Sequence, residues 1–308
     1  MLIKFDKNLI NQDIYAEGVE LRQIMGDRPG KKPVPEDKKR FVARLKSPVL
    51  VTDMPEIVRQ LRDSTVRDTV FQLFQAYPRT VEYDGVGAWW LPQRHKNVWC
   101  PSIDTLVFAR ALKKILSKNN NFIKAAEVGC GSGFLSKYIS LKNKNTKVVN
   151  LFDINPYALL CARDNIVGIK KKFNFSIKDW KKESRNKKYD LLICNPPYIP
   201  RPKSLDNNPY EGLSLIREIL FEGPKHLNQG GVIMTTYSSL CEKEFKNYVK
   251  EAGIKYEVME KMRVPLKVLP VLNNKEWMKY LTKTGKLKKH HEKGYHYWQT
   301  IYIVKIQP

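Results

Sequence analysis

Cysteine is scarce in this sequence and long apolar runs are missing, and both features limit what the protein can be. The five cysteines among 308 residues stand far apart and form no Cys-x-x-Cys pair. An odd, scattered set is typical of free thiols in a reducing compartment. No apolar run approaches the roughly 18–20 residues that cross a bilayer, and the first residues lack the apolar core of a secretory signal. We therefore expect a globular, cytoplasmic protein without membrane contact.

Acidic residues are also few, because 31 Asp and Glu stand against 55 Lys and Arg, a net charge of +24. Such an excess favours a polyanionic partner such as RNA, DNA or a ribosome. A genome biased toward lysine would leave the same mark, so both explanations stay open. The excess is uneven: residues 1–100 hold 17 basic and 13 acidic residues, a net of +4, and residues 101–308 hold the remaining +20.

The first hundred residues predict two units. Residues 1–78 favour a small, mostly helical domain, in which 53–77 has a capping aspartate, a proline in its first turn and apolar residues at near-helical spacing. Residues 79–92 and 96–101 are typical of a β-ribbon centred on Asp-Gly-Val-Gly. We take residues 79–101 as a linker.

From residue 102 to residue 308, predicted strands alternate with predicted helices. Such alternation is typical of an α/β domain with a doubly wound, mostly parallel sheet. The predicted strands are 121–130, 147–154, 174–180, 189–195, 230–238, 255–264 and 296–306, and the predicted helices are 103–118, 133–142, 155–168, 214–227 and 239–253.

A glycine-rich loop follows the first of these strands. The segment "EVGCGSGFL" has glycines at 129, 131 and 133 between a strand and a helix. Glycines there permit a tight turn and a close approach of backbone amides to a ligand. The spacing differs from the G-x-G-x-x-G of nicotinamide enzymes, and no P-loop lysine follows. Alone, such a loop is often only a turn.

Polar residues end the next strands as well, which gives the glycine loop a context. Asp153 stands 26 residues after Glu127, where a carboxylate can accept hydrogen bonds from ribose hydroxyls. Asp179 ends the third strand and could meet an adenine amino group beside the flat face of Trp180. Asn195 ends the fourth strand. Because the carboxyl ends of parallel strands meet at one edge, these residues predict a nucleoside-binding cleft.

With these residues, the chain resembles the class I methyltransferases that use S-adenosylmethionine, over about residues 100–305. The resemblance implies a Rossmann-like, mostly parallel sheet with an antiparallel last strand, and S-adenosylhomocysteine as the product. It places Glu127 near the amino group of the cofactor and Ile154 on its adenine. The cofactor-binding residues that it implies are Glu127, Gly129, Gly131, Gly133, Asp153, Ile154, Asp179, Trp180 and Asn195.

The segment "LLICNPPYIP" narrows the chemistry, because a buried strand stops at two prolines that cannot continue its hydrogen-bond ladder. An amide or exocyclic amine nitrogen is a poor nucleophile, since its lone pair is delocalised. The side-chain oxygen of Asn195 and the carbonyl of Pro196 can each accept one N–H of such a group, and the prolines keep both acceptors rigid. Tyr198 would stack on the flat substrate. The catalytic residues would be Asn195, Pro196 and Tyr198.

Among methyltransferases with this Asn-Pro-Pro-Tyr motif, the chain most resembles the protein-glutamine enzymes that act on release factors or a ribosomal protein. "NPPYIP", "PYEGLSLIREIL" (209–220) and "CPSIDTLV" (100–107) carry the resemblance. The family's linker reads more like Pro-Arg-Pro-x-Thr, and here Ser102 and Ile103 replace Arg and Pro, while Thr105 keeps its place. The resemblance implies a glutamine of a translation protein as substrate, with residues 1–78 in substrate recognition.

A nucleic-acid methyltransferase that modifies an exocyclic amine of adenine or guanine stays open as the alternative, because the same residues serve a flipped base. Residues 170–188 and 275–298 interleave aromatics with lysines, as an RNA-binding surface or a plain solvated face would. His290, His291 and His296 lack cysteine or carboxylate partners, so we expect no metal. A binding module without catalysis is disfavoured, since it would need no paired acceptors.

Overall fold

The computed structural model describes the α/β domain and the ribbon that precedes it. The described residues are 13–14, 43–44, 49–51, 79–91, 94–99, 101–118, 121–203, 212–266, 268–272, 274–292 and 295–307. The predicted helix over 53–77, and most of the domain predicted over 1–78, lie outside them. The described parts of 1–78 are the short strands β1 (Asp13–Ile14), β2 (Ala43–Arg44) and β3 (Val49–Val51).

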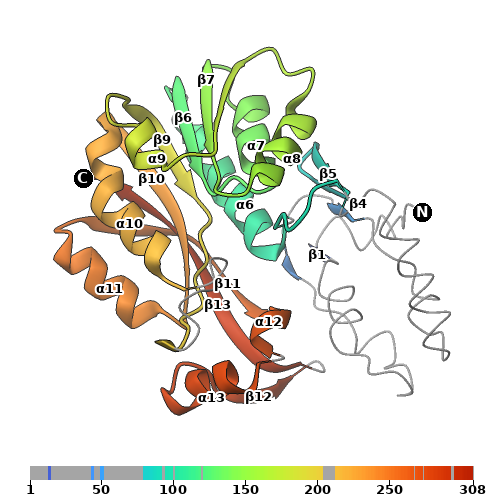
Figure 1. The fold of residues 1–308 in the computed structure, drawn as a ribbon, viewed down its shortest axis with the longest axis vertical. Coiled ribbons are helices and arrows are strands. Elements are labelled where there is room, and N and C mark those ends of the chain that lie inside the picture. The colour runs from blue at the N-terminus through green and yellow to red at the C-terminus, as the bar shows by residue number, and fades with distance from the viewer. Residues whose placement is uncertain are drawn as a thin grey trace, which may run out of the picture.

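One twisted sheet forms the centre of the molecule (Figure 1), with the strand order β11-β13-β10-β9-β6-β7-β8. The strands from β10 to β8 in this order pair in parallel, and β13 pairs antiparallel with both β10 and β11. This confirms the predicted mostly parallel sheet with an antiparallel last strand. The strands are β6 (Lys124–Val128), β7 (Val148–Phe152), β8 (Lys172–Ser176), β9 (Tyr189–Cys194), β10 (Leu227–Ser238), β11 (Lys255–Pro265) and β13 (Tyr295–Gln307).

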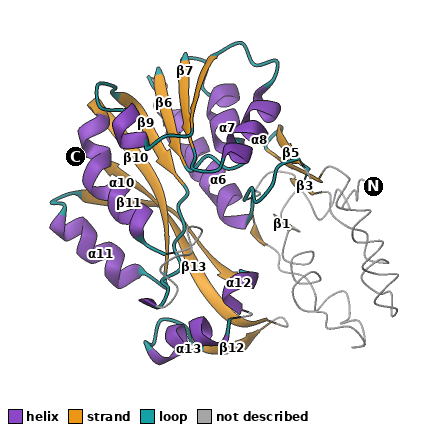
Figure 2. Ribbon diagram, in the orientation of Figure 1, coloured by secondary structure: helices purple, strands orange, loops and turns teal. Residues whose placement is uncertain are grey.

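Helices cover both faces of this sheet (Figure 2). One apolar core lies under α6 (Ile103–Lys118), α7 (Phe134–Lys142) and α8 (Pro156–Ile166), and a second lies under α9 (Trp180–Glu183), α10 (Ser214–Glu222) and α11 (Glu242–Glu251). The 3-10 helix η2 (Gly223–His226) continues α10. The four cysteines among the described residues are buried free thiols, as predicted. Of the helices described, none is long and apolar enough to pass through a membrane.

Local signals explain where several elements begin and end. The side chain of Asn155 accepts the backbone N–H of Tyr157 and caps α8, with Pro156 in the first turn. The third strand differs from its prediction over 174–180, because β8 ends at Ser176. Asp179 therefore lies beyond the strand, where its carboxylate accepts the backbone N–H of Lys181 and caps α9. A capping aspartate and a strand-ending aspartate look alike in sequence.

The predicted ribbon is a hairpin of β4 (Arg79–Tyr83) and β5 (Val86–Trp90). Asp84 and Gly85 both have positive φ, as a two-residue hairpin turn requires. The prediction fails over 96–101, where the described residues form no strand. β3 pairs antiparallel with β4, so the hairpin takes a third strand from the segment before residue 79.

This hairpin packs on the α/β domain as part of its core. Asp84 accepts hydrogen bonds from the Tyr138 hydroxyl at 2.7 Å and the Lys113 amine at 2.8 Å, which joins the turn to α7 and α6. Val81 and Tyr83 are fully buried in the cluster under α6. The segment predicted as a linker is therefore fixed to the domain that it precedes.

Residues 266–294, which we call the insert, connect β11 to β13. The described part holds α12 (Leu269–Leu272), α13 (Lys275–Lys283) and β12 (Lys289–Glu292). Because β11 runs parallel to β10, it ends at the same edge of the sheet as β6 and β9, and the insert lies at that edge. Its buried Trp277 donates the indole N–H to the carbonyl of Pro200 at 2.7 Å.

We predict that Gly133→Ala destabilises the fold far more than Gly168→Ala. Both glycines have a left-handed φ, which costs an alanine roughly 1–2 kcal/mol. A Cβ on Gly133 would also lie 2.7 Å from the Cβ of Ala162 in α8, whereas nothing lies within 4 Å of a Cβ on Gly168. The clash adds roughly 1–3 kcal/mol. Urea unfolding of both variants measures the difference, and equal losses would contradict it.

Candidate functional site

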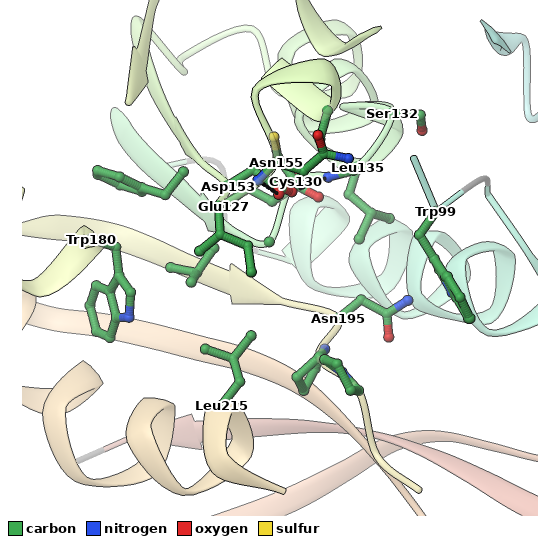
Figure 3. Close-up of a pocket in the computed structure, with 18 of the residues that line it drawn as sticks. Trp99, Glu127, Cys130, Ser132, Leu135, Asp153, Asn155, Trp180, Asn195 and Leu215 are labelled. Atoms are coloured by element: carbon green, nitrogen blue, oxygen red, sulfur yellow. Dashed lines mark hydrogen bonds between the residues drawn. The ribbon is translucent and has the colours of Figure 1, made fainter. Parts of the chain in front are cut away.

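A cavity of about 600 Å³ opens at the carboxyl ends of β6, β7 and β9 (Figure 3). Trp99 and Trp180 lie at opposite ends of it, and Glu127, Asp153 and Asn195 come from the strand ends between them. The carboxyl edge of a parallel sheet is where α/β proteins bind ligands. The cavity is therefore the candidate site.

The glycine loop forms the wall after β6 and is held tightly against the next strand. The backbone N–H groups of Gly129 and Cys130 donate to the Phe152 carbonyl at 2.8 and 3.1 Å. Gly131 lines the cavity with positive φ, and a Cβ there would lie 3.0 Å from the Trp99 carbonyl. A glycine is thus required at 131 by backbone conformation and by close approach.

Gly133 stands apart from the other two glycines. It does not line the cavity, and it packs against Ala162 where α7 approaches α8. Helix packing therefore explains this glycine, and we leave it out of the cofactor-binding set proposed below.

Asp153 follows β7 and supports the glycine loop. Its Oδ2 accepts the N–H of Gly131 at 2.9 Å, and its Oδ1 accepts the N–H of Asn155 at 2.9 Å. Burial raises the pKa of Asp153, against the lowering effect of these amides. Each carboxylate oxygen has a further lone pair, so Asp153 can also accept hydrogen bonds from a ligand in the cavity that it lines.

Glu127 lies deeper, near the end of β6, and is 3% exposed. Its Oε2 accepts the backbone N–H of Ser136 at 3.0 Å and the Ser136 hydroxyl at 2.5 Å. Burial raises the pKa of Glu127 to about 8, and the two hydrogen bonds from Ser136 oppose that rise. The Glu127 side chain therefore links the end of β6 to the first turn of α7, and it also lines the cavity.

At the far end of the cavity, Ile154 is 71% exposed, so an apolar ligand surface could cover it. Asp179 is exposed and lines the cavity. Trp180 lines it too but is buried, and its indole N–H donates to Glu218 on α10. This end thus offers one apolar surface, one exposed carboxylate and the edge of a packed indole.

Asn195 directly follows β9, and its two amide atoms have very different surroundings. Nδ2 donates to Asp104 Oδ2 at 2.9 Å and lies 3.5 Å from the hydroxyl of Thr105. Oδ1 is buried and has no hydrogen-bond partner among the residues that the structure describes. Asn195 therefore lines the cavity and holds a buried acceptor that no described residue uses.

The segment after Asn195 is anchored from the insert. Tyr198 packs against all three apolar clusters of the described structure. Ile199 is fully buried beside Trp277, whose indole N–H donates to Pro200. Two prolines and this anchor hold the backbone at Pro196, which lines the cavity with Tyr198.

The segment before α6 closes the cavity on another side. Asn155 donates its side-chain N–H to the carbonyls of Lys96 and Asn97, each at 3.0 Å. Trp99, which is 51% exposed, and Pro101 then line the cavity. The segment that continues from the β-ribbon to α6 thus contributes directly to the site.

Apart from Gly133, every predicted site residue lines one cavity: Glu127, Gly129, Gly131, Asp153, Ile154, Asp179, Trp180, Asn195, Pro196 and Tyr198. Thr105 lies there too. Sequence reasoning missed Asp104, Trp99 and Glu218. An aspartate in the first turn of a helix usually indicates only dipole complementation, and a tryptophan next to a cysteine and a proline indicates no chemistry.

Comparison with known proteins agrees with this geometry. The sequence model of the family described as "Methyltransferase small domain" matches residues 102–261, about half of the chain. A candidate protein N5-glutamine methyltransferase from Methanocaldococcus jannaschii is 30% identical over 189 residues, which cover 58% of this chain and 92% of that protein. A release factor glutamine methyltransferase from Clostridium acetobutylicum is 28% identical over 176 residues, which cover 51% of this chain and 61% of that protein.

Among solved structures, a ribosomal protein L11 methylase from Lactobacillus delbrueckii subsp. bulgaricus has a TM-score of 0.43 and 15% identity, covering 67% of this chain and 80% of that one. The family match spans the glycine loop, Asp153 and Asn195, which all lie at the cavity. The chain belongs to the methyltransferase small domain family and is an S-adenosylmethionine-dependent methyltransferase.

Proposed function

We propose that this enzyme methylates the side-chain nitrogen of a glutamine in a translation protein, either a release factor or a ribosomal protein. The observation that carries the proposal is the buried Oδ1 of Asn195, an acceptor that finds no donor among the described residues. Leaving a buried acceptor unpaired costs roughly 1–3 kcal/mol, so such a group calls for an explanation. A primary amide in the cavity would supply the missing N–H donor.

The cavity fits S-adenosylmethionine in size and in the chemistry of its walls. Its volume of about 600 Å³ lies within the usual range of ligand pockets, roughly 300–1,000 Å³. The glycine loop would meet the methionine end, Asp153 the ribose, and Ile154 with Asp179 the adenine. We infer a cofactor-binding set of Glu127, Gly129, Gly131, Asp153, Ile154, Asp179, Trp180 and Asn195.

The proposed mechanism uses two acceptors and needs no ionised base. Asn195 Oδ1 and the Pro196 carbonyl would each accept one N–H of the substrate –NH2 group, and Tyr198 would stack on its plane. When bound, S-adenosylmethionine supplies an electrophilic methyl group. As the substrate nitrogen becomes positive, its N–H groups donate more strongly, so both acceptors stabilise the transition state more than the ground state. The proton can leave afterwards to water.

Glutamine is favoured over a nucleobase by the names of the relatives, one a candidate protein N5-glutamine methyltransferase and the other a release factor glutamine methyltransferase. Residues 1–78 would recognise the protein substrate. A cytoplasmic enzyme would meet such substrates on or near ribosomes, and the net charge of +24 would favour that polyanionic environment.

An RNA or DNA methyltransferase acting on an exocyclic amine is the second candidate, and the same charge is the observation that favours it. An adenine or guanine amine presents two N–H groups in a plane, as glutamine does, so the acceptor pair alone does not separate the two substrates. The partner would then be the nucleic acid itself, with its base flipped into the cavity.

The deciding experiment incubates the purified protein and methyl-labelled S-adenosylmethionine with extract from cells that lack the enzyme. We expect protease to release the label, and complete digestion to give N-methylglutamine. Release by nucleases alone, with a labelled nucleoside, would replace the glutamine proposal by the nucleic-acid one.

We predict that Asn195→Ala retains the cofactor and loses transfer. Without the Oδ1 acceptor, kcat should fall by about 100-fold or more. The Kd of S-adenosylmethionine should change less than about threefold, because the other residues of the inferred cofactor-binding set remain in place. Methyl-transfer assays stopped at fixed times measure kcat, and titration calorimetry measures the Kd of S-adenosylmethionine.

Asn228→Ala is the matched control, since Asn228 also donates to an aspartate, at 2.6 Å, but at the opposite edge of the sheet. Its kcat should stay near wild type. A wild-type rate in Asn195→Ala would remove the mechanism.

We predict that Asp153→Ala weakens S-adenosylmethionine binding by roughly 10- to 100-fold, the loss expected for hydrogen bonds to a charged group. Asp190→Ala is the control, because Asp190 likewise accepts two backbone amides, from Ile123 and Lys124, away from the cavity. Calorimetry should show weak binding for the first variant alone. Equal affinity in both would exclude Asp153 from the ribose site.

A further inference from the structure

The Asn195 amide is held by a carboxylate that comes from another part of the chain. Asp104, in the first turn of α6, is 4% exposed and lines the cavity. Its Oδ2 accepts the Nδ2–H of Asn195 at 2.9 Å, and its Oδ1 accepts the hydroxyl of Ser102. Within the described structure, the Asp104 carboxylate thus receives side-chain donors on both oxygens.

Helix capping does not account for this arrangement. At the start of α6, the Ser102 carbonyl accepts the N–H of Leu106, and the Ser102 N–H donates to the Thr105 hydroxyl. The Asp104 carboxylate receives none of these backbone groups. A buried charge that faces a cavity and contacts one catalytic amide points to a role in the reaction.

The two ends of an asparagine amide have nearly the same shape but opposite hydrogen-bonding character, since the oxygen only accepts and the nitrogen only donates. A carboxylate is acceptor-only, so Asp104 can pair with the nitrogen of Asn195 and not with its oxygen. The Thr105 hydroxyl, 3.5 Å from the same nitrogen, is compatible with this orientation. The oxygen is thereby turned away from Asp104.

We propose that Asp104 is a positioning residue that fixes which end of the Asn195 amide faces the substrate. The proposal rests on the function proposed above, in which Asn195 Oδ1 accepts an N–H of the substrate. With the amide reversed, Nδ2 would oppose the donors of an –NH2 group and push the reacting nitrogen out of place. Asp104 makes that reversal unfavourable before the substrate arrives, which is preorganisation.

The test is Asp104→Asn, which keeps the size of the side chain and removes its acceptor-only character. An asparagine at 104 can donate to Oδ1 of Asn195 or accept from Nδ2, so both amide orientations become possible. We expect kcat to fall by about 100-fold, as for loss of one preorganised polar contact. The Kd of S-adenosylmethionine should change less than about threefold, and thermal melting should show a folded protein. A wild-type kcat would overturn the proposal.

Asp84→Asn is the matched control. It also removes a half-buried carboxylate that joins α6 to another segment, through Lys113 and Tyr138, but away from the cavity. Its melting temperature should fall while kcat of the folded protein stays unchanged. A loss of kcat equal to that of Asp104→Asn would mean that both carboxylates act only through stability. If Asp104→Asn does not fold, Asp104→Ser allows the same two orientations in a smaller side chain and replaces it.

A double-mutant cycle separates this proposal from the proposed function. If Asp104 acts through Asn195, adding Asp104→Asn to Asn195→Ala should lower kcat no further, and a multiplied loss would overturn the positioning role. If Asn195→Ala itself has a wild-type rate, the acceptor mechanism fails whatever Asp104 does.

The amide signal of Asn195 gives a readout that does not depend on activity. In 15N-labelled protein, this signal is identified by its absence in Asn195→Ala. One of its protons should be shifted downfield by the carboxylate, and the shift should be lost in Asp104→Asn. An unchanged signal would show that Asp104 does not hold the amide.

Discussion

The reversal of strand order at β6 is the constraint on which the site depends. β7 and β8 lie on one side of β6, and β9 and β10 lie on the other, so the connections after β6 and β9 run to opposite faces of the sheet (Figure 1). A crevice must open where the two connections part. The glycine loop and Asn195 are therefore neighbours, although 62 or more residues separate them in the sequence. The insert and α6 then add groups to a crevice that the topology has already made.

Within that crevice the protein maintains an arrangement that does not benefit its own stability. The buried Oδ1 of Asn195, which meets no donor in the described part of the chain, is unfavourable by roughly 1–3 kcal/mol, and a relaxed asparagine would rotate to avoid it. Asp104 opposes rotation of the Asn195 amide, because its carboxylate accepts a hydrogen bond from Nδ2 and could not accept one from Oδ1. Trp277 holds the backbone that follows Asn195, through its hydrogen bond to the Pro200 carbonyl. The acceptor is thus kept in place by contacts on either side of it, which is what a preorganised catalytic group requires.

The sequence predicted the parts of this site that local signals mark. Glycines 129 and 131, Asp153 and Asn195 each stand at the end of an apolar run, and a parallel sheet brings such ends together. Asp104 escaped prediction because its partner is 91 residues away, and within its own helix it resembles an ordinary first-turn acid. Gly133 is the converse case: its spacing fits the ligand loop, but it does not line the cavity, and the close approach of α8 explains it. Asp179 was predicted to end the third strand but caps α9 beyond it, because an aspartate that caps a helix and one that ends a strand cannot be told apart in the sequence.

Substrate choice must lie outside the acceptor pair. Glutamine and an exocyclic base amine both offer two N–H groups in one plane, so Asn195 and Pro196 would accept either with similar geometry. Discrimination would then fall to the other residues that line the cavity, among them Trp99 from the segment before α6 and Val268 from the insert. These residues differ from the acceptors in kind, since Trp99 is an exposed aromatic side chain, Val268 is an aliphatic side chain of the insert, and neither side chain offers an oxygen acceptor. The same catalytic centre could therefore serve different macromolecules when the segments around it change, and the net charge of +20 over residues 101–308 would act on that outer level of recognition.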